Sequence, residues 1–92
     1  MIRSFRHRGL RLLHERGDAS RIHAAHRNRI ARILGYLNMA RQPRDMDFPG
    51  LRLHPLTGNL IEFWSVSVSD NWRIIFRFED NHVCDVDLVD YH

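Results

Sequence analysis

The spacing of apolar residues changes once along this chain, and that change constrains the fold more than any other feature. In the first half, apolar side chains recur every three or four residues, as in an amphipathic helix, at Ile22, Ile30, Ile33, Leu34 and Leu37. In the second half they alternate with polar side chains, as in a half-buried strand. Helices followed by consecutive strands predict an α+β domain, in which two N-terminal helices pack on a small antiparallel β-sheet.

Residues that start and stop helices divide the first half of the chain. Residues 2–5 are compatible with a short strand, and residues 6–16 with a helix that buries Leu10 and Leu13. Gly17 stands where such a helix stops, because glycine readily adopts the left-handed conformation of a C-cap. We therefore expect a first helix that ends at Gly17.

The second helix has its own start and stop signals. Asp18 and Ser20 are residues that commonly cap a helix N-terminus, so we expect them to precede it. Pro43 ends the helical pattern, and residues 43–50, with two prolines and one glycine, are typical of a loop.

Three strands are expected over residues 60–68, 72–79 and 83–92. Asp70-Asn71 and Asp80-Asn81 separate them, and the first pair suits a two-residue hairpin turn. The alternation predicts one apolar face that receives the helices, formed by Trp64, Val66, Val68, Trp72, Ile74, Phe76, Phe78, Cys84, Val86 and Leu88.

The opposite face of this predicted sheet would be polar and open. Arg73 and Arg77 alternate with the apolar positions of the middle strand and therefore point to that face. Phe63 has the same parity as the polar residues, which makes it a candidate for an exposed contact. Asp85, Asp87 and Val89 should lie opposite Cys84 on the last strand.

Length and composition favour one globular domain over residues 1–92 in the cytoplasm. Single domains commonly hold about 100–150 residues, and 27% charged with 43% hydrophobic residues is ordinary for a folded chain. No apolar run approaches the roughly 18 residues that a membrane span needs, and the charged N-terminus does not look like a secretory signal. Cys84 is the only cysteine, so an internal disulfide is excluded.

Positive charge is concentrated in the first half of the chain. All fourteen basic residues are arginine; residues 1–54 carry a net charge of +8 and residues 55–92 one of −5. A GC-rich genome would explain the missing lysine but not this asymmetry, which predicts a basic surface that binds a polyanion such as RNA or the ribosome. The guanidinium group donates two parallel hydrogen bonds to phosphate, and the candidates for this contact are Arg6, Arg8, Arg21, Arg27, Arg29 and Arg32.

Four segments together resemble one known family. They are SFRHRGL (4–10), DMDFPGLRLHPL (45–56), WSVSVSDNWRIIFRFE (64–79) and VDLVDYH (86–92). In this order they resemble the HigB toxins of the RelE-like toxin–antitoxin superfamily. The resemblance implies a toxin that enters the ribosomal A site and cuts translated mRNA, and a HigA-type antitoxin with a helix-turn-helix domain.

The resemblance also implies a set of catalytic residues. A histidine in the LHPL-type segment corresponds to His54, an arginine in the NWRI strand to Arg73, and the C-terminal group to Asp90, Tyr91 and His92. All five match the pattern of the family. The departures lie elsewhere: Asp70 stands where glycine is common in the turn, and arginine replaces lysine throughout.

These residue types suit RNA cleavage without a metal ion or other cofactor. Such cleavage needs a base for the 2′-OH proton, an acid for the departing 5′ oxygen, and a cation beside the phosphorus. Imidazole can serve as base or acid near neutral pH, so His54 and His92 are assigned to proton transfer. Arg73 would stabilise the phosphate, and Asp90 and Tyr91 would orient the reacting groups.

Other interpretations stay open at this point. A basic module that binds the ribosome or nucleic acid and inhibits growth without cutting message would need arginine but no acid–base pair. A protein that only pairs with an antitoxin would leave the basic half unexplained. His23 and His26 are three residues apart on a predicted helix, but no carboxylate or cysteine completes a metal site there. No glycine-rich phosphate loop supports nucleotide hydrolysis.

Overall fold

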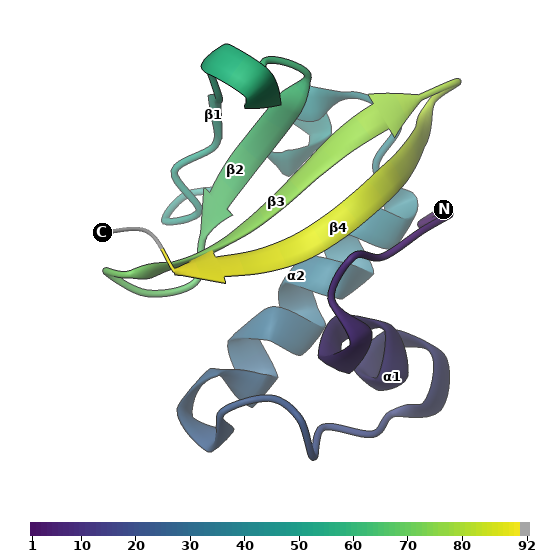
Figure 1. Cartoon of the computed structure of the whole chain (residues 1–92), viewed down its shortest axis with the longest axis vertical. Coiled ribbons are helices and arrows are strands. Elements are labelled where there is room, and N and C mark those ends of the chain that lie inside the picture. The colour runs from purple at the N-terminus through teal and green to yellow at the C-terminus, as the bar shows by residue number, and fades with distance from the viewer. Residues whose placement is uncertain (91–92) are drawn as a thin grey trace.

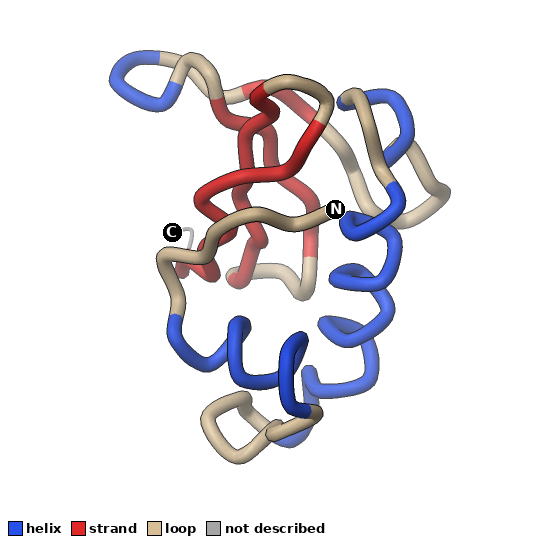
Figure 2. The backbone as a smooth tube through the Cα atoms, turned by 90° about the vertical axis from the view of Figure 1, so that its right-hand side faces the viewer, coloured by secondary structure: helices blue, strands red, loops and turns tan. Residues whose placement is uncertain are grey.

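A computed structural model, which describes residues 1–90, confirms that two helices precede an antiparallel sheet. The helices lie along one side of the sheet (Figure 1), and Figure 2 shows the same arrangement from a view turned by 90°. The four strands are neighbours in the order in which they follow along the chain. The main elements are α1 (Arg8–Arg16), α2 (Arg27–Met39), β1 (His54–Pro55), β2 (Phe63–Ser67), β3 (Trp72–Glu79) and β4 (His82–Asp90).

Helix α1 is fixed by a cap at each end. The His7 side chain accepts a hydrogen bond from the Leu10 amide through Nδ1, at 3.1 Å, which satisfies one of the free N–H groups of the first turn. Gly17 has a φ of 68°, and its amide donates to the carbonyls of Leu12 and Leu13. The predicted stop at Gly17 is therefore confirmed, and the helix begins two residues later than expected.

The predicted caps of the second helix are wrong. The Asp18 carboxylate accepts a hydrogen bond from the Ser20 amide at 3.0 Å, and this local turn ends well before the helix. Such side-chain-to-backbone bonds compete with helix formation. A short 3₁₀ turn, Ala24–His26, intervenes, and α2 begins at Arg27. Ile22 is nevertheless buried, because its side chain packs in the main core.

The main core lies between the helices and the inner face of the sheet. The apolar stripe of α2 is confirmed, because Ile30, Ile33, Leu34 and Leu37 are all buried. They pack against the inner face of the sheet, which is centred on Phe76 and Val66. Met46 and Leu51, from the connection between α2 and β1, close one end of this core. The segment expected to be a loop over residues 43–50 contains a 3₁₀ turn, Pro43–Met46.

One residue of β4 reverses the alternation that the sequence predicted. The register of β3 with β4 shifts between Ile75 and Arg77, where β4 has one residue more than β3. Asp85, with a φ of 54°, is part of this bulge. Val83 consequently joins Val86 in the main core, whereas Cys84 pairs with Arg77 on the other side of the sheet. Cys84 is buried, but the prediction that it shares a face with Val86 and Leu88 is wrong.

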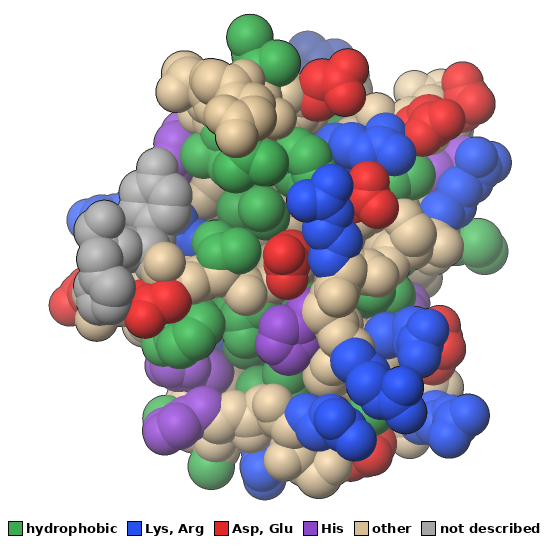
Figure 3. Space-filling view, viewed as in Figure 1, with side chains coloured by type: hydrophobic (Ala, Val, Ile, Leu, Met, Phe, Trp, Pro, Cys, Tyr) green, Lys and Arg blue, Asp and Glu red, His purple; other side chains and the backbone are tan. Residues whose placement is uncertain are grey.

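The outer face of the sheet is not simply polar. Phe63 is only 5% exposed and packs with Leu56 and Ile75 in a second apolar cluster, so its prediction as an exposed contact is wrong. The cause is the connection between β1 and β2, which contributes Leu56 and Leu60 to this cluster. Figure 3 shows the apolar side chains that gather on this face, with basic ones beside them.

The two turns of the sheet differ. Residues 68–71 form a four-residue connection between β2 and β3, in which Val68 and Ser69 both donate to the Trp72 carbonyl. The predicted two-residue turn at Asp70-Asn71 is therefore wrong. Asp80 and Asn81 do form a two-residue turn, with φ values of 51° and 63°, the pattern of a type I′ hairpin.

The N-terminal segment runs parallel to β4. It makes two isolated bridges, Ile2 to Val83 and Phe5 to Val86, where a short strand was expected over residues 2–5. Backbone bonds alternate between the two segments, such as the Arg6 amide to the Val86 carbonyl at 2.8 Å. In the part of the chain that the structure describes, no helix is long and apolar enough to span a membrane.

Candidate active site

His54 stands at the start of β1 with one ring nitrogen already engaged. Its Nδ1 lies 3.1 Å from the carbonyl oxygen of Arg52, a residue with a φ of 53°. A carbonyl oxygen can only accept a hydrogen bond, so Nδ1 carries the proton in this contact. In the neutral ring, Nε2 then carries no proton and has a free lone pair. A general base needs such a lone pair to accept a proton.

Arg73 contacts Ser65, the residue of β2 that lies opposite His54 in the sheet. The strand register pairs His54 with Ser65, and the Arg73 guanidinium donates through Nη1 to the Ser65 hydroxyl at 3.3 Å. Ser65 is completely buried although it is polar. The structure therefore brings His54 and Arg73 together around Ser65. Ser65 alternates with Trp64 and Val66, which predicts this face for it, but no feature of the sequence indicates that it pairs with His54 and bonds to Arg73.

Asp90 is positioned differently from the other two described residues. It is the last residue of β4, it is exposed, and its Cα partner is Trp72. Arg73 pairs with the preceding residue, Val89, so alternation along β4 directs Asp90 away from the face of Arg73. Tyr91 and His92, the remaining predicted catalytic residues, lie outside the described residues.

Arg77, the second arginine of the outer face, forms an ion-pair network. Its Nε lies 2.7 Å from Asp85 Oδ2, and its Nη1 lies 3.0 Å from Glu79 Oε2. The hydrogen bonds to Asp85 and Glu79 raise the pKa of Arg77 above its usual range. The hydrogen bond from Arg77 lowers the pKa of Asp85. The Ser4 hydroxyl also accepts a hydrogen bond from the Asp85 amide, at 2.8 Å. Arg77 therefore stabilises the bulge of β4.

Asp85→Asn should make the protein less sensitive to acid. Because the folded pKa of Asp85 is below the unfolded value of about 3.9, its contribution is complete above that pH and is lost as the pH falls through the folded pKa. We expect Asp85→Asn to lower Tm by a few degrees at pH 7, and we expect this difference from wild type to shrink as the pH falls through the folded pKa of Asp85. Thermal unfolding by circular dichroism between pH 7 and 2 measures both.

The matched control is Asp80→Asn, because Asp80 also has a positive φ and is exposed in a turn. Asparagine tolerates this backbone conformation, so neither substitution adds strain. Asp18 and Asp45, whose pKa values are also lowered by local hydrogen bonds, contribute equally to all three proteins. A Tm curve for Asp85→Asn that runs parallel to wild type down to pH 2 would contradict the assignment.

The six arginines predicted to bind RNA or the ribosome fall into two groups. Arg8, Arg21 and Arg32 are exposed, and basic side chains gather over the region of α1 in Figure 3. Arg6 is exposed too, with its guanidinium carbon 4.9 Å from the centre of the Phe63 ring. Contact of these residues with a polyanion stays a prediction.

Arg27 and Arg29 have structural contacts in addition to that predicted role. The Arg27 Nε donates to the Ile22 carbonyl at 2.8 Å. The Arg29 Nη2 donates to the carbonyls of Ser67 and Gly50, each at 3.0 Å. Arg29 thereby ties α2 to the end of β2 and to the segment that leads to His54.

His23 and His26 have ring centroids 5.4 Å apart, on the 3₁₀ turn before α2. Among residues 1–90, no group of three or more histidine, cysteine or acidic side chains is arranged to hold a metal ion. On the outer face, His54 and Arg73 offer imidazole and guanidinium chemistry.

Comparison with known proteins identifies a family and a curated relative. The profile of a family described as the RelE-like toxin of type II toxin–antitoxin system HigB matches residues 3–92. A curated protein of Proteus vulgaris, named Endoribonuclease HigB, is 37% identical over 92 residues, which are the whole of this chain and the whole of that protein.

Proposed function

Because this chain belongs to the RelE-like HigB toxins of type II toxin–antitoxin systems, we propose that it cuts translated mRNA in the ribosomal A site without a metal ion. The endoribonuclease activity follows from the family and from the full-length similarity to a curated endoribonuclease. The dependence on the ribosome and the catalytic roles of individual residues are our extension.

The observation that carries the proposed chemistry is the contact between His54 Nδ1 and the Arg52 carbonyl oxygen. The His54 Nδ1–H donates to the Arg52 carbonyl, so Nε2 is available to take the proton of the 2′-OH. The 2′ oxygen then attacks the phosphorus, and the bond from phosphorus to the 5′ oxygen breaks. The products are a 2′,3′-cyclic phosphate and a free 5′-OH.

Two further groups complete this scheme. The Arg73 guanidinium, which donates to Ser65, the Cα partner of His54, stabilises the negative charge that builds on the phosphoryl oxygens. We assign His92 as the acid that protonates the departing 5′ oxygen, and Asp90 and Tyr91 as groups that orient it. No step needs a metal ion or other cofactor.

Partners follow from the family and from the charge of the chain. A toxin of a toxin–antitoxin system has a cognate antitoxin, and we propose a HigA-type protein with a helix-turn-helix domain. The 70S ribosome and its mRNA are the proposed binding partners of the basic surface formed by Arg6, Arg8, Arg21, Arg27, Arg29 and Arg32. A ribosomal substrate places the activity in the cytoplasm.

The second candidate function is growth inhibition by binding alone, which the basic first half favours. A binder of this kind would occupy the ribosome without breaking message. His54 and Arg73 on one face favour the enzyme, because a binder does not need a base beside its cation.

Cleavage in a programmed ribosome tests the proposal directly. We expect wild-type protein to cut mRNA in a 70S complex with an empty A site, and to cut the same mRNA at least tenfold more slowly when it is free. The reason is that the ribosome supplies the positioning of the strand, which contributes much of the rate in such reactions. Products are read by primer extension under single-turnover conditions, with EDTA-treated toxin alongside.

Two outcomes would contradict parts of the proposal. Equal rates on free and ribosome-bound mRNA would remove the dependence on the ribosome. Ribosome binding without any cleavage would instead support the second candidate function, and the catalytic roles would then be withdrawn.

A further inference from the structure

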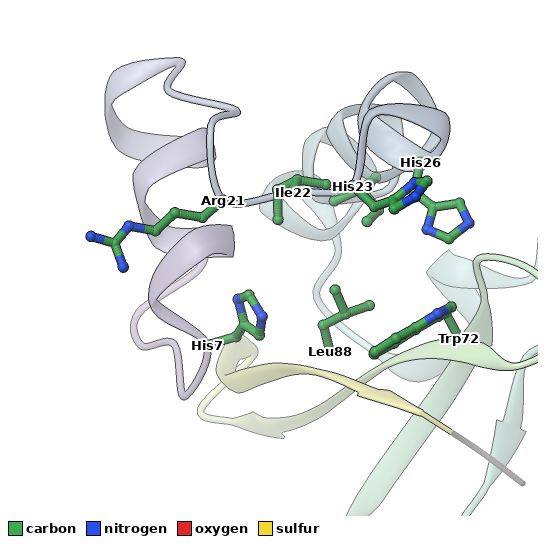
Figure 4. A pocket seen from close by; sticks show the side chains of 8 residues that line it. His7, Arg21, Ile22, His23, His26, Trp72 and Leu88 are labelled. Carbon is green, nitrogen blue, oxygen red and sulfur yellow. The ribbon is translucent and has the colours of Figure 1, made fainter.

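A cavity of about 230 Å³ lies on the inner side of the sheet, apart from the face that carries His54 and Arg73. The connection between α1 and α2 forms one wall, and the ends of β3 and β4 form the other (Figure 4). Its volume is below the roughly 300–1,000 Å³ of sites for drug-sized ligands, which suits a single ring system. The residues that line it are His7, Arg21, Ile22, His23, His26, Ile30, Trp72 and Leu88.

Two of the three histidines that line this cavity present hydrogen-bond donors. Nδ1 of His7 accepts from the Leu10 amide at 3.1 Å, and Nδ1 of His23 accepts from the Ala25 amide at 3.2 Å. In a neutral ring whose Nδ1 is an acceptor, the proton is on Nε2. The indole N–H of Trp72 is also only a donor. Among the described residues that line the cavity, none is acidic, so the ligand must supply the acceptor oxygens or nitrogens.

The shape of the cavity favours a flat ligand. Figure 4 shows the indole of Trp72 beside Leu88 on one side, and Ile22 with the rings of His23 and His26 on the other. The Arg21 side chain points away from this space in the same view. Aromatic faces on both sides accept a planar ring by stacking, and nucleobases combine such a ring with acceptor atoms on their edges.

The cavity also adjoins the proposed reaction centre. Its wall residue Trp72 is the Cα partner of Asp90 and directly precedes Arg73 in the chain. A strand of RNA that reaches Arg73 on the outer face therefore has this cavity beside it, around the end of the β3–β4 ladder. We propose that the cavity holds one base of the RNA, adjacent to the bond that is cut. The inference rests on the proposed function for the identity of the ligand.

Nucleotide binding to the free protein tests the inference without measuring cleavage. The probes are an RNA trinucleotide and, separately, inorganic phosphate, and the readout is quenching of Trp72 fluorescence in a Trp64→Phe background. We expect the trinucleotide to quench Trp72, and we expect His23→Asn to weaken binding about fivefold or more, since base stacking is the main contribution. Asparagine keeps an acceptor for the Ala25 amide, and His23 is exposed, so the fold is preserved.

The matched control is His14→Gln. It removes an imidazole from the same half of the chain, at a position that packs on Phe5 outside the cavity. Unchanged affinity in this control and weakened affinity in His23→Asn would support the inference. Equal affinity in all three proteins, or quenching by phosphate as strong as that by RNA, would overturn it.

Cleavage on the ribosome is measured in parallel to separate the two proposals. Trinucleotide binding by a protein that cuts no mRNA would refute the proposed function and still support a base in this cavity. Normal cleavage by His23→Asn together with no quenching of wild type would refute the inference and leave the proposed function standing.

Discussion

His54→Ala is expected to lower the rate of mRNA cleavage on the ribosome by roughly 10²–10⁴-fold, the usual contribution of one general base. The alanine side chain cannot take the 2′-OH proton, whereas Arg73 and Ser65 keep their contact. Single-turnover cleavage in a programmed ribosome measures the loss, and a cosedimentation assay with ribosomes shows whether binding is preserved. Because His54 is only half-buried, its removal leaves a small cavity at most.

His92→Ala is the companion experiment, and the same loss is expected if His92 is the acid. His14→Ala serves as the control, because it removes an imidazole of α1 that packs on Phe5. If His54→Ala cleaved at the wild-type rate, its role as base would be wrong. If only His92→Ala were slow, the base would have to be sought among the other groups of the site.

Phe76→Ala is expected to destabilise the fold by about 3–5 kcal/mol, the typical cost of removing a buried phenyl ring. Phe76 is fully buried in the middle of β3, and its ring lies edge-on to Phe78 at a centroid distance of 5.9 Å. Domains of this size have a free energy of unfolding of only about 5–15 kcal/mol, so the substitution removes much of the total. Urea denaturation followed by circular dichroism measures it.

Ile61→Ala is the control for this loss, since Ile61 is 72% exposed on the connection to β2. Substitutions at such positions usually change the free energy of unfolding by less than about 0.5 kcal/mol. Similar urea midpoints for the two variants would contradict the placement of Phe76 at the centre of the core.

Much of the fold could be predicted because periodicity reports which face of an element is buried. The stripe of α2 was predicted from spacing alone, and Gly17 was predicted as a C-cap from its conformational freedom. Asp18 and Ser20 were misassigned because a turn and a helix cap use the same side-chain chemistry. Propensity does not distinguish the two when the connection is long.

The errors in the sheet have a different physical origin. The bulge at Asp85 adds one residue to β4 relative to β3. Alternation along one strand does not show how many residues of the neighbouring strand lie opposite it, so the bulge could not be predicted. Phe63 was placed on the correct face, but its burial depends on Leu56 and Leu60, which reach that face through a connection. Contacts between segments distant in the sequence have no local signal.

The candidate site could be predicted only in part for the same reason. The resemblance to a family supplied His54 and Arg73, and the register of three strands then placed them around Ser65. Neither the buried hydroxyl nor the Arg52 carbonyl that fixes the His54 tautomer has a sequence signature. The opposite orientation of Asp90 likewise became visible only through its pairing with Trp72.

The parallel bridges between the N-terminal segment and β4 limit how another protein can attach to the sheet. The amide and carbonyl groups of Val83 and Val86 that would otherwise be open at this edge are bonded to Met1, Arg3, Ser4 and Arg6. An incoming strand from an antitoxin or from a second copy would first have to peel these residues away. β1, at the opposite edge, is only two residues long and offers a poor template for strand addition. Strand addition at Val83 and Val86 is therefore blocked, and a protein that binds at this part of the edge meets side chains instead of free backbone groups.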